Sequence, residues 1–179
     1  MIKGSCLCGA IEYEVEEIPG KVYNCHCSQC RKSHGAAFST QAFAKGATLR
    51  FIKGKDHLKE YRQFPEHGGI RAFCSTCGSR LMNYLPDKNI YLSVALSSID
   101  SDFNAGPVAH AFVGSKASWH QPSGDIPSFE SIPEGALEKR QFITTPSTRT
   151  CKSAASLCFC TPVMANVQAV EKLKMKKWC

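Results

Sequence analysis

Three cysteines lie within six positions in the hexapeptide CHCSQC, residues 25–30. A C-x-C step and a C-x-x-C turn each bring their sulfur atoms to the inside of a tight bend, so the three thiols can reach one metal ion. Zinc takes four ligands, and a protein that supplies only three leaves one position for water or a substrate. We therefore interpret Cys25, Cys27 and Cys30 as a candidate catalytic zinc site.

Two alternatives remain open for this cluster. A fourth ligand from elsewhere in the chain, such as His34, His67 or a cysteine near the C-terminus, would close it into a structural site. A metal-free redox cluster is the other alternative, although the βαβ pattern that accompanies a redox C-x-x-C motif is missing. His26 stands between two ligands, so we expect its ring to point away from the metal, at the surface or behind the ligands.

Four further cysteines form two half-sites far apart in the sequence. Cys6 and Cys8 precede one glycine, and Cys74 and Cys77 precede another. Together these thiols are enough for one closed tetrahedral zinc site, and such a site couples metal binding to folding. The sequence therefore predicts two zinc ions per chain, one structural and one catalytic.

The composition of the 179 residues, 43% hydrophobic and 21% charged, is that of a soluble globular protein. No signal-peptide pattern opens the chain, and no apolar run is long enough to span a membrane. We therefore expect a cytoplasmic protein without a membrane partner. An odd total of eleven cysteines, seven of them in tight clusters, favours metal binding over a disulfide framework.

The positive charge is concentrated near the C-terminus. Residues 1–135 hold 14 Lys and Arg against 13 Asp and Glu, whereas residues 136–179 hold 8 against 2. We expect a zinc-binding catalytic domain over residues 1–135 and a basic extension over 136–179, consisting of a linker and a short helix near residues 163–173. A nucleic acid or another acidic partner is expected only through this extension.

Short alternating segments separated by glycine predict a mainly β fold of several small antiparallel sheets around the two zinc sites. In the first segment, residues 9–16, Ile11, Tyr13 and Val15 share one face, and Pro19-Gly20 is expected to break the chain after it. A helical turn is expected at residues 28–32, with Ser28 as its N-cap. The remaining strands are predicted at residues 21–24, 37–43, 48–52, 58–62, 70–73, 80–84, 89–94 and 108–113.

The motifs resemble one known family. They are residues 6–9 (CLCG), 25–31 (CHCSQCR), 73–78 (FCSTCG), 117–120 (ASWH) and 126–129 (IPSF). Over about residues 1–134 the chain resembles the glutathione-dependent formaldehyde-activating enzymes, a family that also includes centromere-protein-V-like proteins. The resemblance implies a zinc-bound β fold, the zinc β-tent, similar to that of the Rab guanine-nucleotide exchange zinc proteins. It also implies that the four-cysteine set is the structural zinc site and the three-cysteine set the catalytic one.

By this resemblance the protein is a carbon–sulfur lyase that handles an aldehyde–thiol adduct, with formaldehyde and glutathione giving S-hydroxymethylglutathione. Arg31, Lys32 and Arg71 are candidates to bind the carboxylates of such an anionic substrate. Trp119 and His120 pack either on the site or on the sheet. A zinc-stabilised binding module that uses the basic extension is the alternative function, and a sensor that releases zinc on oxidation is a third.

Overall fold

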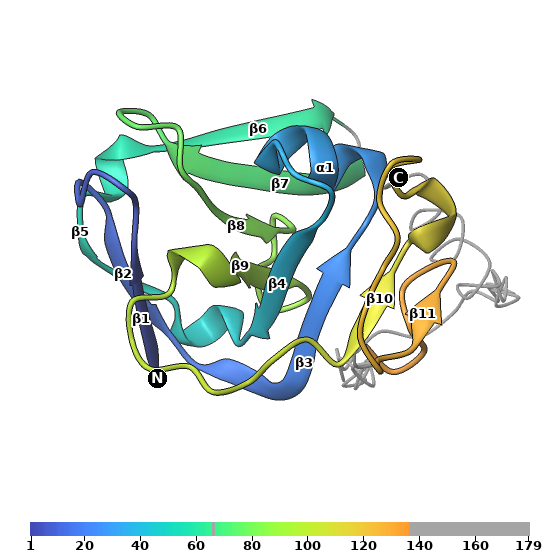
Figure 1. Cartoon of the computed structure of the whole chain (residues 1–179). Helices are drawn as coiled ribbons and strands as arrows, with labels where there is room; N and C mark the ends of the chain where they lie inside the picture. The colour runs from blue at the N-terminus through green and yellow to red at the C-terminus, as the bar shows by residue number, and fades with distance from the viewer. Residues whose placement is uncertain (66, 137–179) are drawn as a thin grey trace, which may run out of the picture.

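A computed structural model describes residues 1–65 and 67–136, which fold into two β-sheets and one short helix (Figure 1). The smaller sheet is antiparallel, with the strand order β1-β2-β5. Its strands are β1 (Ile2–Ser5), β2 (Glu12–Val15) and β5 (Arg50–Lys53). The prediction of a mainly β fold with antiparallel sheets and two cysteine clusters is confirmed.

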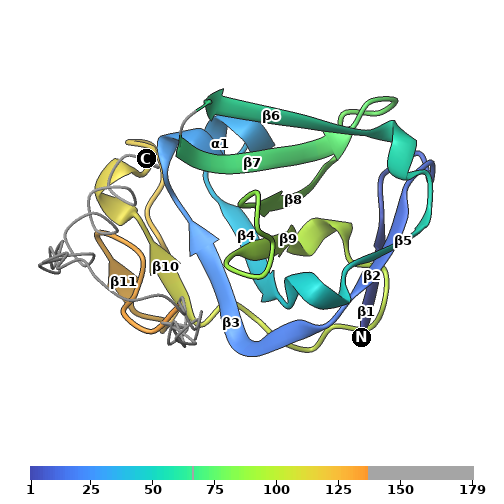
Figure 2. The same cartoon turned by 180° about the vertical axis from the view of Figure 1, so that it is seen from behind.

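The larger sheet has eight strands. In spatial order they are β11 (Ser128–Phe129), β10 (Ala109–Ala111), β3 (Glu17–Cys25), β4 (Ser39–Ala44), β9 (Leu92–Ala95), β8 (Arg80–Tyr84), β7 (His67–Cys74) and β6 (Leu58–Phe64). From β3 to β6 every neighbouring pair is antiparallel, whereas β10 runs parallel to both β3 and β11. The small sheet lies at one end of the molecule and β10 and β11 at the other, as Figure 2 shows from behind.

The helix α1 (Ser28–His34) begins immediately after β3 and places the cysteine hexapeptide at a strand-to-helix junction. The prediction of Ser28 as N-cap is wrong, because Cys27 holds the extended backbone conformation of a cap and its sulfur accepts the Cys30 N–H at 3.3 Å. Single turns of 3₁₀ helix connect other strands, at η1 (Gly46–Thr48), η2 (Lys55–His57), η3 (Leu96–Ser98) and η4 (Val113–Ser115).

The predicted break at Pro19-Gly20 is also wrong, because both residues lie inside β3. The pairing of β3 with β4 shifts register between Glu17 and Val22, and this irregularity accommodates a residue that lacks an N–H and one at φ +70°. The strand therefore continues across the bulge to Cys25 and connects the small sheet to the site.

The main core joins both sheets. Ile11, Tyr13 and Val15, which the alternation placed on one face, are fully buried, and they belong to the same cluster as Leu81 and Val94 of the large sheet. The Tyr13 hydroxyl forms a buried hydrogen bond of 2.7 Å with the Ser98 hydroxyl. The large sheet, whose strand β3 leads to the three-cysteine cluster, is thus stabilised by apolar packing with the small sheet.

The linker and the short helix expected in the basic extension lie outside the described residues, and the domain boundary at residue 135 stays a prediction. Within residues 1–65 and 67–136, none of the helices has the length and apolar character to cross a membrane.

Candidate metal centres and the adjoining cavity

The four-cysteine cluster joins two loops that are far apart in the sequence. Cys6 and Cys8 follow β1, Cys74 ends β7, and Cys77 lies in the turn before β8. All four sulfur atoms lie within 4.8 Å of one another, with Cys6 and Cys8 at 3.6 Å and Cys8 and Cys74 at 3.9 Å. Sulfur atoms around one tetrahedral zinc ion are about 3.8 Å apart. A disulfide bond would need about 2.05 Å, so the spacing fits a metal site.

Hydrogen-bond donors around this cluster favour ionised sulfur. The Ile11 N–H donates to Cys6 at 3.2 Å and the Thr76 N–H to Cys74 at 3.4 Å. The hydroxyl and then the backbone N–H of Ser79 lower the pKa of Cys77 to about 5. The Ala10 N–H lowers the pKa of Cys8, but burial and the neighbouring thiols outweigh it and raise that pKa to about 11. A bound cation would compensate the negative charges, so the cluster could hold a metal ion as thiolates.

The three-cysteine cluster is assembled locally by the junction of β3 and α1. Cys25 ends β3, Cys27 caps the helix and Cys30 lies in its first turn, and their sulfur atoms are within 4.8 Å of one another. In the part of the chain that the structure describes, no fourth His, Cys, Asp or Glu joins this group.

Of the alternative fourth ligands, His34 is outside the group, and its Nε2 lies 3.4 Å from the Gln41 amide nitrogen. The side chain of His67 and the C-terminal cysteines are beyond the described residues.

The thiols of this cluster oppose one another's ionisation. Hydrogen bonds with Cys27 and Cys30, and then burial, raise the pKa of Cys25 well above its usual value. A hydrogen bond with Cys25 lowers the pKa of Cys30, but the Cys27 thiol and burial outweigh it and raise that pKa to about 11. A bound cation removes this opposition, because it compensates the negative charges. The donor set of three close thiols therefore fits a soft cation such as zinc.

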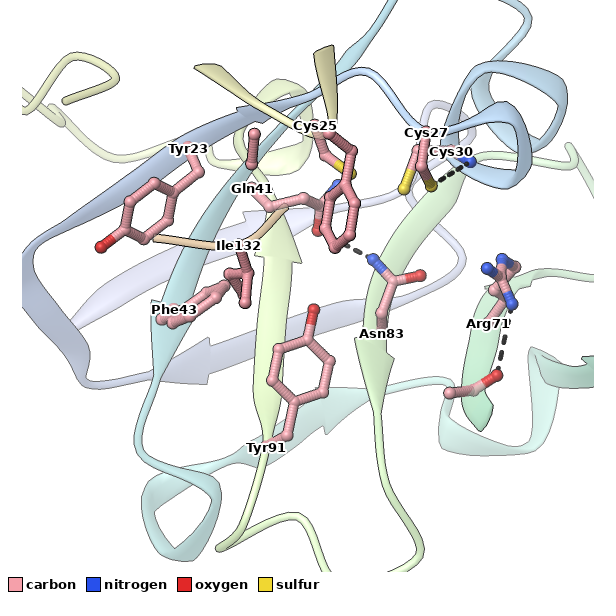
Figure 3. Close-up of a pocket in the computed structure, with 13 residues that line it drawn as sticks. Tyr23, Cys25, Cys27, Cys30, Gln41, Phe43, Arg71, Asn83, Tyr91 and Ile132 are labelled. Carbon is pink, nitrogen blue, oxygen red and sulfur yellow. Dashed lines mark hydrogen bonds between the residues drawn. The ribbon is translucent and has the colours of Figure 1, made fainter. Parts of the chain in front are cut away.

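A cavity adjoins the three cysteines (Figure 3). Its empty volume is about 800 Å³, part of which is open solvent. Thirteen residues line it: Tyr23, Cys25, Cys27, Cys30, Gln41, Phe43, Gly69, Arg71, Asn83, Tyr91, Ala111, Phe112 and Ile132. A group bound at the thiols would thus lie at the wall of a cavity lined by four aromatic rings.

The polar part of this wall is held in one orientation. Arg80 donates to the amide oxygen of Asn83 at 2.7 Å, which leaves the Asn83 NH₂ to donate to Gln41 Oε1 at 2.9 Å. The Ser93 hydroxyl also donates to Gln41 Oε1, at 3.0 Å, and hydrogen-bonds the Tyr91 hydroxyl at 3.0 Å. Because Arg80 fixes the amide, the Asn83 NH₂ faces Gln41 Oε1 and, at 3.5 Å, the Ser93 hydroxyl, which it also donates to.

Of the three predicted anion-binding residues, Arg71 lines the cavity and the other two do not. The Arg71 guanidinium donates to Gln29 Oε1 and, at 3.3 Å, to the Gly69 carbonyl. Arg31 donates instead to the Ser115 carbonyl at 3.1 Å, and Lys32 is exposed on α1. Arg71 is the only one of the thirteen lining residues with a cationic side chain.

His26 points away from the cavity, as its place between two cysteines suggests, but it is completely buried and not at the surface. Its Nε2 lies 2.8 Å from His110 Nδ1, and His110 Nε2 lies 3.2 Å from the Ser123 carbonyl. A carbonyl only accepts, so His110 donates to Ser123 and His26 donates to His110. Burial lowers the pKa of His26 to about 4, and the ring of His120 stacks on it.

Sequence reasoning missed most of the cavity wall. One available signal was the two-residue period of strands: Tyr23 lies two residues before Cys25 on β3, and Gln41 and Phe43 are two apart on β4. Each pair therefore shares a face of the sheet. Phe112 carried no such signal, because its place beside Cys25 depends on the pairing of Cys25 with Ala111 across the parallel strands.

Fold and site together define a mainly β protein with two cysteine clusters that could each bind a metal ion, one of them beside an open cavity. The model of the glutathione-dependent formaldehyde-activating enzymes matches residues 1–115, and the chain belongs to that family.

A protein of Halomonas elongata that bears the name of the same family is 30% identical over 124 residues, which are 66% of this chain and 79% of that protein. A crystal structure of a Rhodobacter sphaeroides protein is similar at 30% identity and a TM-score of 0.48, over 57% of this chain and 92% of that one.

Proposed function

We propose that this protein is a carbon–sulfur lyase that joins the thiol of glutathione to formaldehyde and gives S-hydroxymethylglutathione. Cys25, Cys27 and Cys30 would hold a catalytic zinc ion with one position open, and the four-cysteine cluster a structural one. The observation that carries the proposal is the location of three clustered thiols in the wall of an open cavity, without a fourth ligand among the described residues. The family name supports the choice of reactants.

The reaction needs no oxidant or reductant. A carbon–sulfur bond forms between the thiol sulfur and the aldehyde carbon, and the carbonyl π electrons move to the oxygen. The oxygen takes up one proton, which balances the proton that the thiol loses. Cys25, Cys27 and Cys30 would hold the zinc ion, which when bound would lower the pKa of the glutathione thiol and so make a thiolate nucleophile available at neutral pH.

The protein's own residues bind and orient the reactants. Arg71 binds a carboxylate of glutathione, because it is the cationic side chain at the cavity. Asn83 would donate an N–H to the aldehyde oxygen in place of its 3.5 Å hydrogen bond to the Ser93 hydroxyl, and Arg80 keeps the amide in the orientation that permits this donation.

The test measures the exchange between free glutathione and S-hydroxymethylglutathione by NMR at equilibrium, with and without the zinc-loaded protein. We expect acceleration above the spontaneous rate, lost on selective removal of one zinc ion. Arg71→Met should raise KM for glutathione about 10- to 100-fold, since a hydrogen bond to a charged group is worth about 1.5–3 kcal/mol.

Arg62→Met is the matched control, because Arg62 lies on the neighbouring strand β6. In the described chain its guanidinium donates a hydrogen bond to the Pro65 carbonyl and does not line the cavity. The substitution should leave KM unchanged. An exchange rate equal to the spontaneous rate would refute the proposed activity, and an unchanged KM in Arg71→Met would refute the role of Arg71.

A further inference from the structure

The cavity has more apolar wall than formaldehyde can use. Formaldehyde has only two heavy atoms and is close in size to water, which occupies about 30 Å³ in the liquid. The cavity's empty volume of about 800 Å³ includes open solvent, but Phe43, Tyr91, Phe112 and Ile132 are among its lining residues. A reactant of one carbon would leave this wall in contact with water.

Glutathione does not match that wall either. It carries two carboxylates and an ammonium group, and burying such charges without partners is costly. None of the thirteen lining residues, all in the described part of the chain, is an Asp or Glu that could pair with the ammonium. The charged ends of glutathione are therefore best placed near Arg71 and the solvent.

The two kinds of wall lie on different sides of the thiols. In Figure 3 Arg71 is on one side of Cys27 and Cys30, whereas Tyr23, Phe43 and Ile132 are on the other. A sulfur atom bound at the cysteines would thus lie between a cationic region, suited to the thiol's carboxylate, and an apolar region, suited to whatever is attached to the sulfur.

Aromatic rings of the apolar region pack against one another. Tyr23 and Phe43 are buried, and their ring centroids are 5.3 Å apart. The rings of Phe43 and Tyr91 form a T-shaped pair with centroids 5.4 Å apart. Phe112 has φ +60° and ψ +40°, a left-handed conformation that costs a non-glycine residue about 1–2 kcal/mol. Phe112 is the only non-glycine residue with positive φ in the described chain, and it lines the cavity.

We infer that this site also takes aldehydes larger than formaldehyde, whose aryl or bulky alkyl group binds in the apolar region defined by Tyr23, Phe43, Tyr91, Phe112 and Ile132. The inference rests on the function proposed above and names the substrate class of the same site. The reaction keeps its balance: the thiol sulfur bonds to the aldehyde carbon, the carbonyl oxygen gains the proton, and the product is the glutathione adduct of a larger aldehyde.

Two stable analogues separate this inference from the formaldehyde reaction. S-methylglutathione resembles the formaldehyde adduct, and S-benzylglutathione resembles the adduct of an aryl aldehyde. Binding of each to the zinc-loaded full chain is measured by titration calorimetry. We expect S-benzylglutathione to bind about 10- to 100-fold more tightly, the ratio that burial of one phenyl ring provides.

Phe112→Gly tests whether the apolar region causes the preference. The substitution removes the ring and is compatible with the left-handed backbone, so the fold should persist, and the binding ratio should fall at least fivefold. Trp119→Ala removes an exposed aromatic residue that does not line the cavity and should leave the ratio unchanged.

Equal affinities for the two analogues, or a ratio that Phe112→Gly does not change, would overturn the inference. If S-methylglutathione binds equally well and the formaldehyde exchange is accelerated, the inference fails while the proposed function stands. If neither analogue binds and no exchange is accelerated, both fail together. Tight, Phe112-dependent binding of S-benzylglutathione without acceleration of the formaldehyde exchange would support the aryl aldehyde and reject formaldehyde as the substrate.

Discussion

A Cys→Ser substitution should destabilise the fold in the four-cysteine cluster but leave it nearly unchanged in the three-cysteine cluster. Structural zinc sites contribute about 10–16 kcal/mol to folding in small zinc peptides, so one of four ligands corresponds to about 2.5–4 kcal/mol. A domain is stable by only about 5–15 kcal/mol. Cys77→Ser should therefore remove a large part of the stability, since Cys77 lies in the cluster that joins the β1–β2 loop to the β7–β8 turn.

Cys27→Ser should leave the fold nearly unchanged. Cys27 is the N-cap of α1, and its sulfur accepts the Cys30 N–H. Serine is among the preferred N-cap residues, so its hydroxyl can accept the same hydrogen bond and keep the helix start. The variant loses one thiolate of the three-cysteine cluster, and we expect a folded protein with less zinc and no activity.

The assay compares soluble yield, thermal unfolding by circular dichroism, and zinc content by atomic absorption for the two variants and the wild type. We expect little soluble Cys77→Ser, and Cys27→Ser with a Tm within a few degrees of wild type. Equal solubility and wild-type zinc content in both variants would refute the division of roles between the clusters. Insolubility of Cys27→Ser would show that this cluster, too, is needed for folding.

Two further predictions concern stability. Burial lowers the pKa of His34 from 6.5 to about 4, so its neutral ring stabilises the fold above pH 6.5, and this contribution is lost as the pH falls toward 4. In urea titrations, His34→Gln should lose less stability over that window than wild type. Parallel stability curves for the two proteins would contradict the reasoning. Gly54 has φ +67°, and an added Cβ would lie 1.8 Å from the Ala10 carbonyl oxygen, so Gly54→Ala should cost about 2–5 kcal/mol of unfolding free energy. Gly35 has a similar φ of +62°, but the space around an added Cβ is open, so Gly35→Ala should cost only about 1–2 kcal/mol of unfolding free energy. Equal losses of unfolding free energy in the two glycine variants would disprove the clash at Gly54.

The sequence predicted the three-cysteine cluster because its geometry is local, and each half of the four-cysteine cluster is local in the same way. Cys25, Cys27 and Cys30 meet within one strand-to-helix junction, so their spacing alone brings the sulfur atoms together. The alternation of Ile11, Tyr13 and Val15 predicted a buried face for the same reason, since a strand's period needs no knowledge of its partners.

The part of the cavity wall that comes from β10 and the residues after it could not be predicted in this way. Phe112 and Ile132 reach the site only because β10 inserts parallel to β3, a pairing between residues more than 80 positions apart. Hydrophobic periodicity does not encode which strands become neighbours. The bulge at Pro19-Gly20 was missed because turn residues in a sequence do not distinguish a chain reversal from an irregularity within a strand.

The two clusters also differ in when they can form during synthesis. A nascent chain that has emerged through residue 60 already holds every thiol of the Cys25–Cys30 cluster, but only Cys6 and Cys8 of the other, whose partners are more than 60 residues further on. Completion of the four-thiol cluster therefore requires that β7 and its following turn have left the ribosome and reached the N-terminal loop. The three-cysteine cluster is therefore accessible to metal before Phe112 and Ile132, which line its cavity, have been synthesised. A growing chain thus passes through an interval in which the thiols of its candidate catalytic site are complete but the cavity beside them is not.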